Sequence, residues 1–398
     1  MTSLTMSPAT DADWPEIFRM DARAFALPAP LPDEEQIEFR AKFPDDATYV
    51  VRDADRIVAF SMYFVLPMTV PGGREVATAG LSWVSVAATH RRRGLLRRML
   101  DTQFADWRAA GHSLAILTAS EATIYERFGF GPAVFAHSVH IDPSTAAFRT
   151  PAPDDSRVRY ATADEVSTRL PDIHARWAAT RPGAIGRPDA WWPSIVADRG
   201  FRRNSQTSGL HYLLHDDGYA SYRIDAREHT ATVDDFVAVT DQAHDDLWRV
   251  LTALDLITSV HVDLPVDDSL PHALTDVRAV AVKGLSDVLW VSILDVADAL
   301  ASRVYGADGV IVLEVGDAYS DRAGRYGLRV SDGDAAITRT DAPADVTLDI
   351  AVLSSLYLGG VAARDLATAG RITGDAEAVR LLDAMFRASR APFSGTYF

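Results

Sequence analysis

The sequence predicts a protein of the α/β (α+β) class, built from three successive regions. β-Branched strands alternate with amphipathic helices in the first two regions, a linker-like stretch separates them, and the last region places several strands before its final helices. A chain of 398 residues is long enough for two or three domains. We therefore expect regions at residues 1–145, 146–286 and 287–398.

The first region has the order of a mixed sheet with a crossover helix. A helix begins within residues 11–18, where aspartates precede Pro15. A second, amphipathic helix over residues 95–110 ends at Gly111. Strands are expected at residues 48–51, 57–64, 81–86 and 114–118, and a short helix after the last strand runs through Tyr125.

Residues 84–98 are the most informative stretch of the chain. A strand leads through an arginine-rich loop into an apolar helix, and residues 91–98 contain five arginines and Gly94. The start of a helix has unpaired N–H groups and a partial positive charge, so phosphates bind there. Guanidinium groups add charge-assisted hydrogen bonds, and glycine lets the backbone approach a ligand. The stretch predicts a polyanion site.

The second region follows a linker, residues 143–157, that is rich in Pro, Asp, Ser and Thr. Strand, loop and helix recur here, with the helix at residues 243–251. Asp245 and Asp246 stand where the first region has arginines, and two carboxylates repel a diphosphate. We interpret the region as a degenerate copy of the first, the alternative being an unrelated αβ unit. Its strands are expected at residues 218–224 and 232–239.

The third region is expected to be an α+β unit. A strand at residues 289–294 and a helix over residues 296–304 open it, and a meander follows. The strands of the meander are placed at residues 310–315, 326–330 and 346–350, and the closing helices at residues 351–357 and 376–386.

Composition narrows the function classes. The net charge of −16 argues against nucleic acid and favours cationic ligands, although acidity also serves solubility. The absence of cysteine excludes disulfides and thiolate nucleophiles, and we find neither a zinc-type spacing of His, Asp and Glu nor a Walker A loop. We see no secretory signal and no bilayer-spanning run, so a cytoplasmic protein without membrane partners is expected.

The loop at residues 91–96 resembles the signature Arg/Gln-x-x-Gly-x-Gly/Ala of the GNAT acetyltransferases, from which Leu96 departs. Residues 68–73, 79–81 and 120–131 extend the likeness. Together they resemble the Eis (enhanced intracellular survival) family of bacterial N-acetyltransferases over the whole chain. The resemblance implies two GNAT-like mixed-sheet domains in tandem, the second degenerate, then a sterol-carrier-protein-like domain. It also implies a homo-oligomer, commonly a hexamer.

The resemblance implies acetyl-CoA as co-substrate, with no metal. Backbone amides and guanidinium groups of the loop hold the diphosphate, the alternative being a merely basic turn. A strand N–H polarises the acetyl carbonyl beside the pantetheine arm. For Arg91 and Arg98 the alternative to diphosphate binding is a solvated charge on the helix face. The expected cofactor-binding residues are Val84, Ser85, Val86, Arg92, Arg93, Gly94, Leu95, Leu96, Arg97, Ser120 and Glu121.

Two catalytic residues follow from the resemblance. Tyr125 matches the general acid, and a phenol with a pKa near 10 is protonated at neutral pH; the alternative is an aromatic packing residue. The carboxylate of Phe398 matches the general base. Its ordinary pKa of about 3.3–3.7 is low for a base, and burial raises it. Chain ends are usually frayed, but the aromatic end after residues 392–395 suggests a docked one.

The expected activity is transfer of acetyl to a primary amine of an aminoglycoside, a polyamine or a lysine side chain, in a ternary complex. Relatives that modify aminoglycosides have an acid just before the last residue, where this chain has Tyr397. One alternative is a lipid or ligand carrier with a vestigial acyltransferase module, and another is a different acyl donor. The expected acceptor-binding residues are Asp21, Phe25, Trp83 and Tyr397, with Glu34, Glu35 and Phe39 as further candidates.

Overall fold

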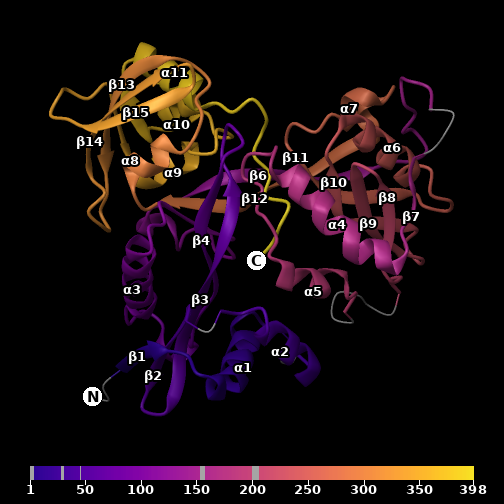
Figure 1. Ribbon diagram of the computed structural model, residues 1–398, viewed down its shortest axis with the longest axis horizontal. Helices are drawn as coiled ribbons and strands as arrows, with labels where there is room; N and C mark the ends of the chain where they lie inside the picture. Colours follow the sequence, from indigo (N-terminus) through magenta and orange to yellow (C-terminus); the bar gives the residue numbers. More distant parts are fainter. Residues whose placement is uncertain (1–3, 28–30, 45, 153–156, 200–205) are drawn as a thin grey trace.

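The computed structural model describes residues 4–27, 31–44, 46–152, 157–199 and 206–398. Twelve strands of the described chain form one large sheet and five form a separate small sheet. Three neighbouring parts are visible in Figure 1: indigo and purple for the start of the chain, magenta and red for its middle, orange and yellow for its end. The C-terminus lies between the first two parts. Residues 153–156 of the expected linker are outside the described residues.

Apart from the short helix expected at Tyr125, the predicted helices and strands of the first part occur in the predicted order, and the α-helix at residues 33–40 and the strands at residues 4–8 and 130–141 were not predicted. The N–H and hydroxyl of Thr10 both donate to the Asp13 carboxylate (2.8 and 2.9 Å) just before Pro15 in the first turn of α1. Gly111, with a φ of +81°, follows the end of α3 as predicted. The elements are α1 (Trp14–Ala24), α2 (Asp33–Arg40), α3 (Leu95–Ala109), β1 (Leu4–Pro8), β2 (Thr48–Asp53), β3 (Arg56–Thr69), β4 (Glu75–Val86), β5 (Leu114–Leu117) and β6 (Phe130–Ile141).

The region around Tyr125 differs from the prediction. No α-helix forms there in the described chain; a turn leads into the short 3-10 helix η3 (Glu126–Phe128). Gly129 follows with a φ of +88°, a left-handed conformation that stops any helix and starts β6. Tyr125 therefore lies on a tight turn and not on a helix face.

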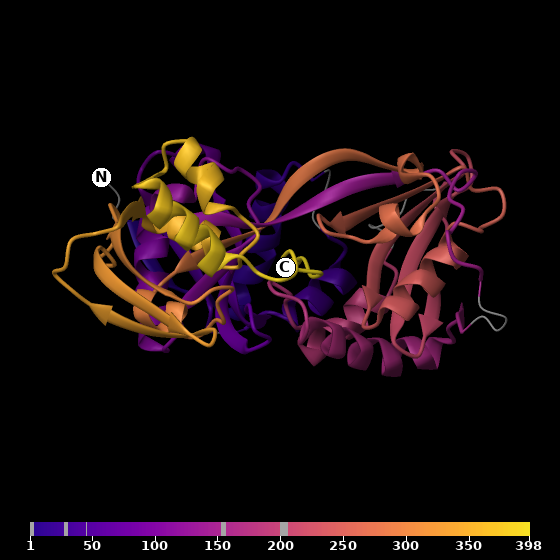
Figure 2. The ribbon, with the colours of Figure 1, turned by 90° about the horizontal axis from the view of Figure 1, so that it is seen from above.

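Two long strands, β6 and β12 (Val280–Ile293), connect the first two parts of the molecule. Residues 130–135 pair with residues 287–292 beside β5, and residues 136–141 pair with both β11 and the start of β12. The sheet order is β1-β2-β3-β4-β5-β12-β6-β11-β10-β9-β8-β7. Figure 2 shows these strands crossing from one part to the other. The strand expected at residues 289–294 thus belongs to the large sheet, and the boundary expected after residue 286 falls inside it.

The second part repeats strand, loop and helix as predicted, with one correction. Only residues 239–240 separate β10 from α6, so Asp245 and Asp246 lie within the helix and not in a loop. Asp241 occupies the first helical turn, where a carboxylate disfavours an anion. The elements are α4 (Ala163–Ala178), α5 (Trp192–Val196), α6 (Asp241–Leu251), α7 (Leu270–Ala273), β7 (Arg159–Tyr160), β8 (His211–His215), β9 (Gly218–Asp225), β10 (Thr230–Ala238) and β11 (Ser259–Pro265).

The C-terminal region, from α8 to α11, forms the small sheet with its covering helices. The sheet order is β15-β14-β13-β16-β17, and β13 and β16 are parallel, so the predicted meander is only partly correct. Strands β15 and β17 and helix α10 were not predicted. The elements are α8 (Val296–Ala301), α9 (Ile350–Leu356), α10 (Ala363–Thr368), α11 (Ala376–Phe386), β13 (Gly309–Gly316), β14 (Gly324–Ser331), β15 (Asp334–Arg339), β16 (Val346–Asp349) and β17 (Ile372–Gly374).

Candidate active site

The candidate site begins at an irregularity in β4. The register with β3 shifts between Ser82 and Ser85, and Trp83 has a φ of +50°. Trp83 and Val84 therefore form a β-bulge, which turns their backbone groups away from the regular ladder. β4 pairs with β5 in parallel only as far as Leu81, so the rest of β4 has no strand partner on that side within the described chain.

The arginine loop, residues 87–94, joins the end of β4 to α3. Arg92 and Gly94 both have left-handed backbones, with φ of +62° and +77°. Gly94 is the N-cap of α3, and a Cβ added to it would meet no atom within 4 Å. Residues 91–93 are exposed, whereas Leu95 is buried and Leu96 half-buried. The loop thus combines an exposed helix start, open space at Gly94 and three exposed arginines, the features that an anion site requires.

Tyr125 is buried close to the end of β5. It is 8% exposed and packs edge-on against Phe130, with 6.0 Å between the ring centroids. Burial, and secondarily the negative charge of Glu121, raises the pKa of Tyr125 to about 12. Ser120 and Glu121 are exposed on the preceding turn. The phenol therefore remains protonated over the whole physiological range of pH.

The C-terminal tail, residues 391–398, is docked on the turn that precedes α5. Ile185 donates its N–H to the Ser394 carbonyl (3.0 Å), and the Thr396 hydroxyl donates to the Ile185 carbonyl (3.0 Å). Arg187 donates to the Gly395 carbonyl (2.6 Å) and to the Thr396 hydroxyl (3.1 Å). These bonds fix the backbone of the tail up to its last two residues.

The last residue reaches the end of the β4 and β5 pair. The Thr118 hydroxyl donates to the Phe398 carboxylate (3.4 Å), and a Cβ added to Gly80 would lie 3.0 Å from the Phe398 ring. Gly80 is the partner of Ile116 in the parallel pair. The docked end that the sequence suggested is therefore present, and its carboxylate lies at the strand ends where the parallel pairing stops.

The Gly395→Ala variant is expected to lose most of its activity while keeping its fold. Gly395 has a φ of +61°, and an added Cβ would overlap the Trp177 ring, so an alanine displaces the tail. Displacement by about 1 Å costs on the order of 10²-fold in kcat. Steady-state kinetics checks this, with Gly370→Ala as control, because Gly370 has a φ of +73° and open space around it. Equal activity of the two variants would contradict the prediction.

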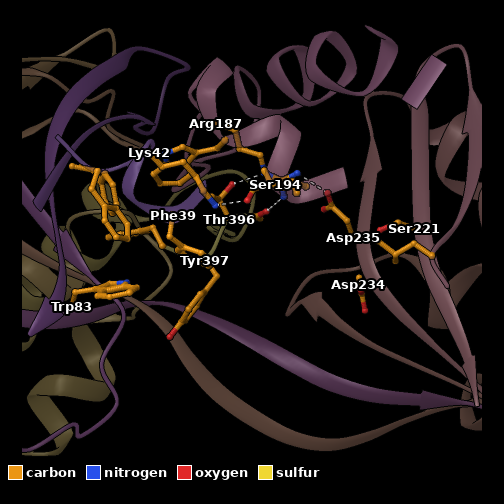
Figure 3. A pocket seen from close by; sticks show the side chains of 17 residues that line it. Phe39, Lys42, Trp83, Arg187, Ser194, Ser221, Asp234, Asp235, Thr396 and Tyr397 are labelled. Carbon is orange, nitrogen blue, oxygen red and sulfur yellow. Dashed lines mark hydrogen bonds and ion pairs between the residues drawn. The ribbon is translucent and has the colours of Figure 1, made fainter. Parts of the chain in front are cut away.

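A cavity of about 580 Å³ opens between the first two parts, with the tail along one side. Figure 3 shows Phe39 and Trp83 on one wall, Asp234 and Asp235 on the opposite wall, and Tyr397 between them. Aromatic side chains and polar or charged side chains contribute equally to the lining. The lining residues are Phe39, Lys42, Phe43, Phe64, Trp83, Arg187, Trp191, Ser194, Ile195, Leu210, Ser221, Asp234, Asp235, Gly395, Thr396, Tyr397 and Phe398.

The side-chain carboxylates of this cavity are already paired. Asp235 accepts from Arg187 at 2.6 Å, with side chains 15% and 7% exposed, and Asp234 accepts from Arg223 at 3.2 Å. Lys42 donates to the Ser194 hydroxyl (2.5 Å) and lies 4.1 Å from the centre of the Phe39 ring. Ion pairing neutralises most of the negative charge that the acidic composition would suggest for this cavity.

Sequence reasoning found only part of the lining. Trp83, Tyr397 and Phe39 line the cavity, whereas Asp21 and Phe25 on α1 do not, and neither do Glu34 and Glu35. The second part contributes residues that sequence reasoning missed, because they are far from the first part in the chain. No local sequence pattern identifies these residues, which are Arg187, Trp191, Ser194, Asp234 and Asp235.

The Asp21→Asn variant is expected to be more stable than the native protein at pH 7.5 by about 1–3 kcal/mol. Burial raises the pKa of Asp21 from 3.8 to about 6. The pKa of Asp21 is higher in the folded state than in the unfolded state. This carboxyl therefore favours folding most at low pH, and its contribution to the free energy of unfolding falls as the pH rises from 3.8 to about 6. Urea unfolding at pH 4.5 and 7.5 checks this. A gain of the same size at both pH values would contradict it.

No helix of the described residues is both long and apolar enough to cross a bilayer. In the same residues no group of three His, Cys, Asp or Glu side chains is arranged to hold a metal ion.

Comparison with known families agrees with this architecture. Residues 5–133 and residues 183–291 match two models that are each described as an acetyltransferase (GNAT) domain. Residues 296–395 match the model of a sterol carrier protein domain. The chain therefore has tandem GNAT domains and a sterol-carrier-like domain, as the sequence resemblance implied.

Individual relatives agree over nearly the full chain. The N-acetyltransferase Eis of Mycobacterium tuberculosis is 38% identical over 96% of this chain and 97% of its own. An uncharacterized N-acetyltransferase of Streptomyces coelicolor is 36% identical over 93% and 94%. The crystal structure of Eis1 from Mycobacterium abscessus superposes with a TM-score of 0.88 at 31% identity, covering 100% of both chains. The chain therefore belongs to the Eis family of GNAT N-acetyltransferases.

Proposed function

We propose that this enzyme transfers the acetyl group of acetyl-CoA to a primary amine bound in the cavity between its first two parts. The observation that carries the proposal is the position of the Phe398 carboxylate. It accepts a hydrogen bond from Thr118 just beyond the point where the parallel pairing of β4 and β5 stops, and Phe398 is also one of the residues that line the cavity. We therefore place the acyl donor and the acceptor on either side of this carboxylate.

The residues at the arginine loop fit the acyl donor. The loop offers a glycine N-cap with open space around it and exposed arginines, which suits a diphosphate. Beyond Leu81, β4 has no strand partner on its β5 side within the described chain, so its backbone can pair with an extended ligand there. We assign the pantetheine arm to residues 82–86 and the polarising N–H to the bulge at Trp83 and Val84. Acetyl-CoA supplies the activated thioester, and all other groups come from the chain.

The chain supplies the two proton transfers. The Phe398 carboxylate accepts a proton from the attacking amine, and the Tyr125 hydroxyl donates one to the departing thiolate. The high pKa of Tyr125, which burial causes, keeps the phenol protonated until that moment. Phe398 reaches the end of β5 through its bond to Thr118, and Tyr125, in the turn before η3, belongs to the hydrophobic cluster that contains Leu117 of β5. We infer direct attack in a ternary complex, since the chain has no cysteine to form an acyl-enzyme thioester.

The charges in the cavity favour an acceptor with a single amine over a polycation. Its side-chain carboxylates pair with Arg187 and Arg223, and within the described chain no cation pairs with the Phe398 carboxylate. One ammonium group is therefore attracted to the tail, while Lys42 repels a second at the other wall. Of the three candidate acceptor classes, a lysine side chain fits better than a polyamine or an aminoglycoside.

A thiol-release assay tests the proposed function. Acetyl-CoA is incubated with the enzyme and with lysine peptides, simple monoamines, polyamines or aminoglycosides. We expect release that depends on an amine and that is fastest with monoamines and lysine peptides. Binding of CoA without release for any amine would contradict the proposed reaction. Stabilisation by an extracted lipid and not by CoA would instead favour the carrier function.

The Gly94→Ala variant is expected to raise KM for acetyl-CoA about five- to tenfold. A left-handed alanine costs about 1–2 kcal/mol, and relief of this strain moves the N–H groups of the arginine loop. Gly111→Ala is the matched control, because Gly111 has a φ of +81° and open space at the opposite end of α3. Both variants lose similar stability, and only Gly94→Ala changes KM. A similar KM for both would contradict the assignment of the loop.

Assembly is a further part of the proposal. The family resemblance implies a homohexamer, and the molar mass of the intact enzyme in solution, measured by light scattering, tests it. We also propose domain boundaries after residues 145 and 286, the second of which lies within β12, the strand that joins the two domains.

A further inference from the structure

One loop of the C-terminal region, residues 317–322 between β13 and β14, contacts both α3 and the turn after Tyr125. We propose that this loop is a positioning element that sets Tyr125 relative to α3, with Arg322 as its principal positioning residue. The inference rests on the proposed role of Tyr125 as general acid. It assigns the sterol-carrier-like domain a part in acetyl transfer that does not involve a lipid.

Arg322 belongs to the C-terminal region, and its side chain is buried against Phe128 and β12. It forms a two-point ion pair with Asp317 (2.7 and 3.3 Å), and the two side chains are 2% and 1% exposed. Its remaining N–H groups donate to the Phe128 carbonyl (3.1 Å), the Ile293 carbonyl (2.8 Å) and the Ser292 hydroxyl (3.0 Å). The guanidinium group thus ties the turn after Tyr125 to β12.

The turn after Tyr125 is shaped for this contact. A Cβ added to Gly129 would overlap the Arg322 guanidinium group, and Gly129 has a φ of +88°. The hydroxyl of Ser354 on α9 donates to the Gly129 carbonyl (3.1 Å), and Arg371 pairs with Glu126. Several contacts from the C-terminal region therefore converge on the 3-10 helix that follows Tyr125, while the described residues leave the Tyr125 hydroxyl without a hydrogen bond.

The same loop anchors α3. The Tyr319 hydroxyl donates to Asp101 (2.6 Å), and the Tyr319 ring packs edge-on against both Phe128 (4.9 Å) and Phe104 (5.3 Å). Arg108 of α3 donates to Asp321 (2.6 Å). Because α3 begins at the arginine loop and η3 follows Tyr125, one rigid loop fixes the distance between the diphosphate site and the general acid.

Kinetics of Arg322→Gln in two backgrounds tests the inference. In the native background we expect kcat to fall about tenfold or more with KM for acetyl-CoA little changed, because a misplaced acid slows the chemical step. In the Tyr125→Phe background we expect Arg322→Gln to have almost no further effect on kcat, since the acid it positions is gone. The control is Arg303→Gln, an equally buried arginine whose bonds reach only Val304, Tyr357 and Phe386. It should lower the melting temperature and leave kcat of the folded enzyme unchanged.

Tyr319→Phe provides a second, milder variant that keeps the ring and should fold. Loss of its bond to Asp101 should raise KM for acetyl-CoA about two- to tenfold with kcat nearly unchanged. Equal losses of kcat from Arg322→Gln in the two backgrounds, or no change of KM in Tyr319→Phe, would overturn the inference. An unchanged kcat in Tyr125→Phe alone would instead overturn the general acid of the proposed function, so the two failures are distinguishable.

Discussion

Deletion of Phe398 is expected to lower kcat about 10²–10⁴-fold, the usual contribution of a general base. The deletion moves the terminal carboxylate back to Tyr397, about 3.3–3.6 Å along the chain, out of reach of Thr118. The bonds of residues 394–396 to Ile185 and Arg187 remain, so the shortened tail stays docked. KM for acetyl-CoA is expected to change little.

Phe398→Leu is the matched control for this deletion. It keeps the carboxylate and removes only the ring that packs near Gly80. We expect a severalfold loss at most, which thiol-release kinetics with a fixed amine will measure. Equal losses in the deletion and in Phe398→Leu would show that the ring matters and the carboxylate does not, contrary to the proposed role.

Tyr125→Phe is expected to lower kcat about 10²-fold or more without destabilising the protein. The ring keeps its packing against Phe130, and the hydroxyl that is removed has no hydrogen-bond partner among the described residues. Its only expected use is proton donation to the thiolate. Better leaving groups need less help, so an activated aryl thioester should recover much of the lost rate. A loss of the same size with both donors would point to a structural role for the hydroxyl.

Most of the fold follows from local sequence. The apolar face of α3 repeats at helical spacing, and the alternation of β2 and β3 predicts their strands, since side-chain periodicity depends only on near neighbours. The arginine loop is also local, because a glycine at a helix start and the flanking arginines carry its chemistry. The bounds of α3 were predicted to within one residue and those of β2 to within two, whereas β3 extends five residues beyond its predicted end.

The remainder depends on contacts between distant residues. Only the end of β12, at residues 289–294, was predicted. Its partners β5 and β6 lie more than a hundred residues away in the chain, and strand periodicity does not identify a partner. The same holds for Arg187, which binds both Asp235 and the tail, and for Arg322, which reaches Phe128. An arginine in a sequence gives no sign that it is buried. The aromatic C-terminal residues suggested a docked end, and the family resemblance, not periodicity, implied a catalytic role for its carboxylate.

The most direct test of the account replaces only the terminal carboxylate. Protein ligation can supply the complete enzyme with Phe398 as its C-terminal amide, which keeps every side chain and removes the charge. Thiol release with a saturating amine, compared with that of the ligated acid form, should fall about 10²-fold or more, while acetyl-CoA binding stays the same. Full activity of the amide form would contradict the assignment of Phe398 as the base that makes this an amine acetyltransferase.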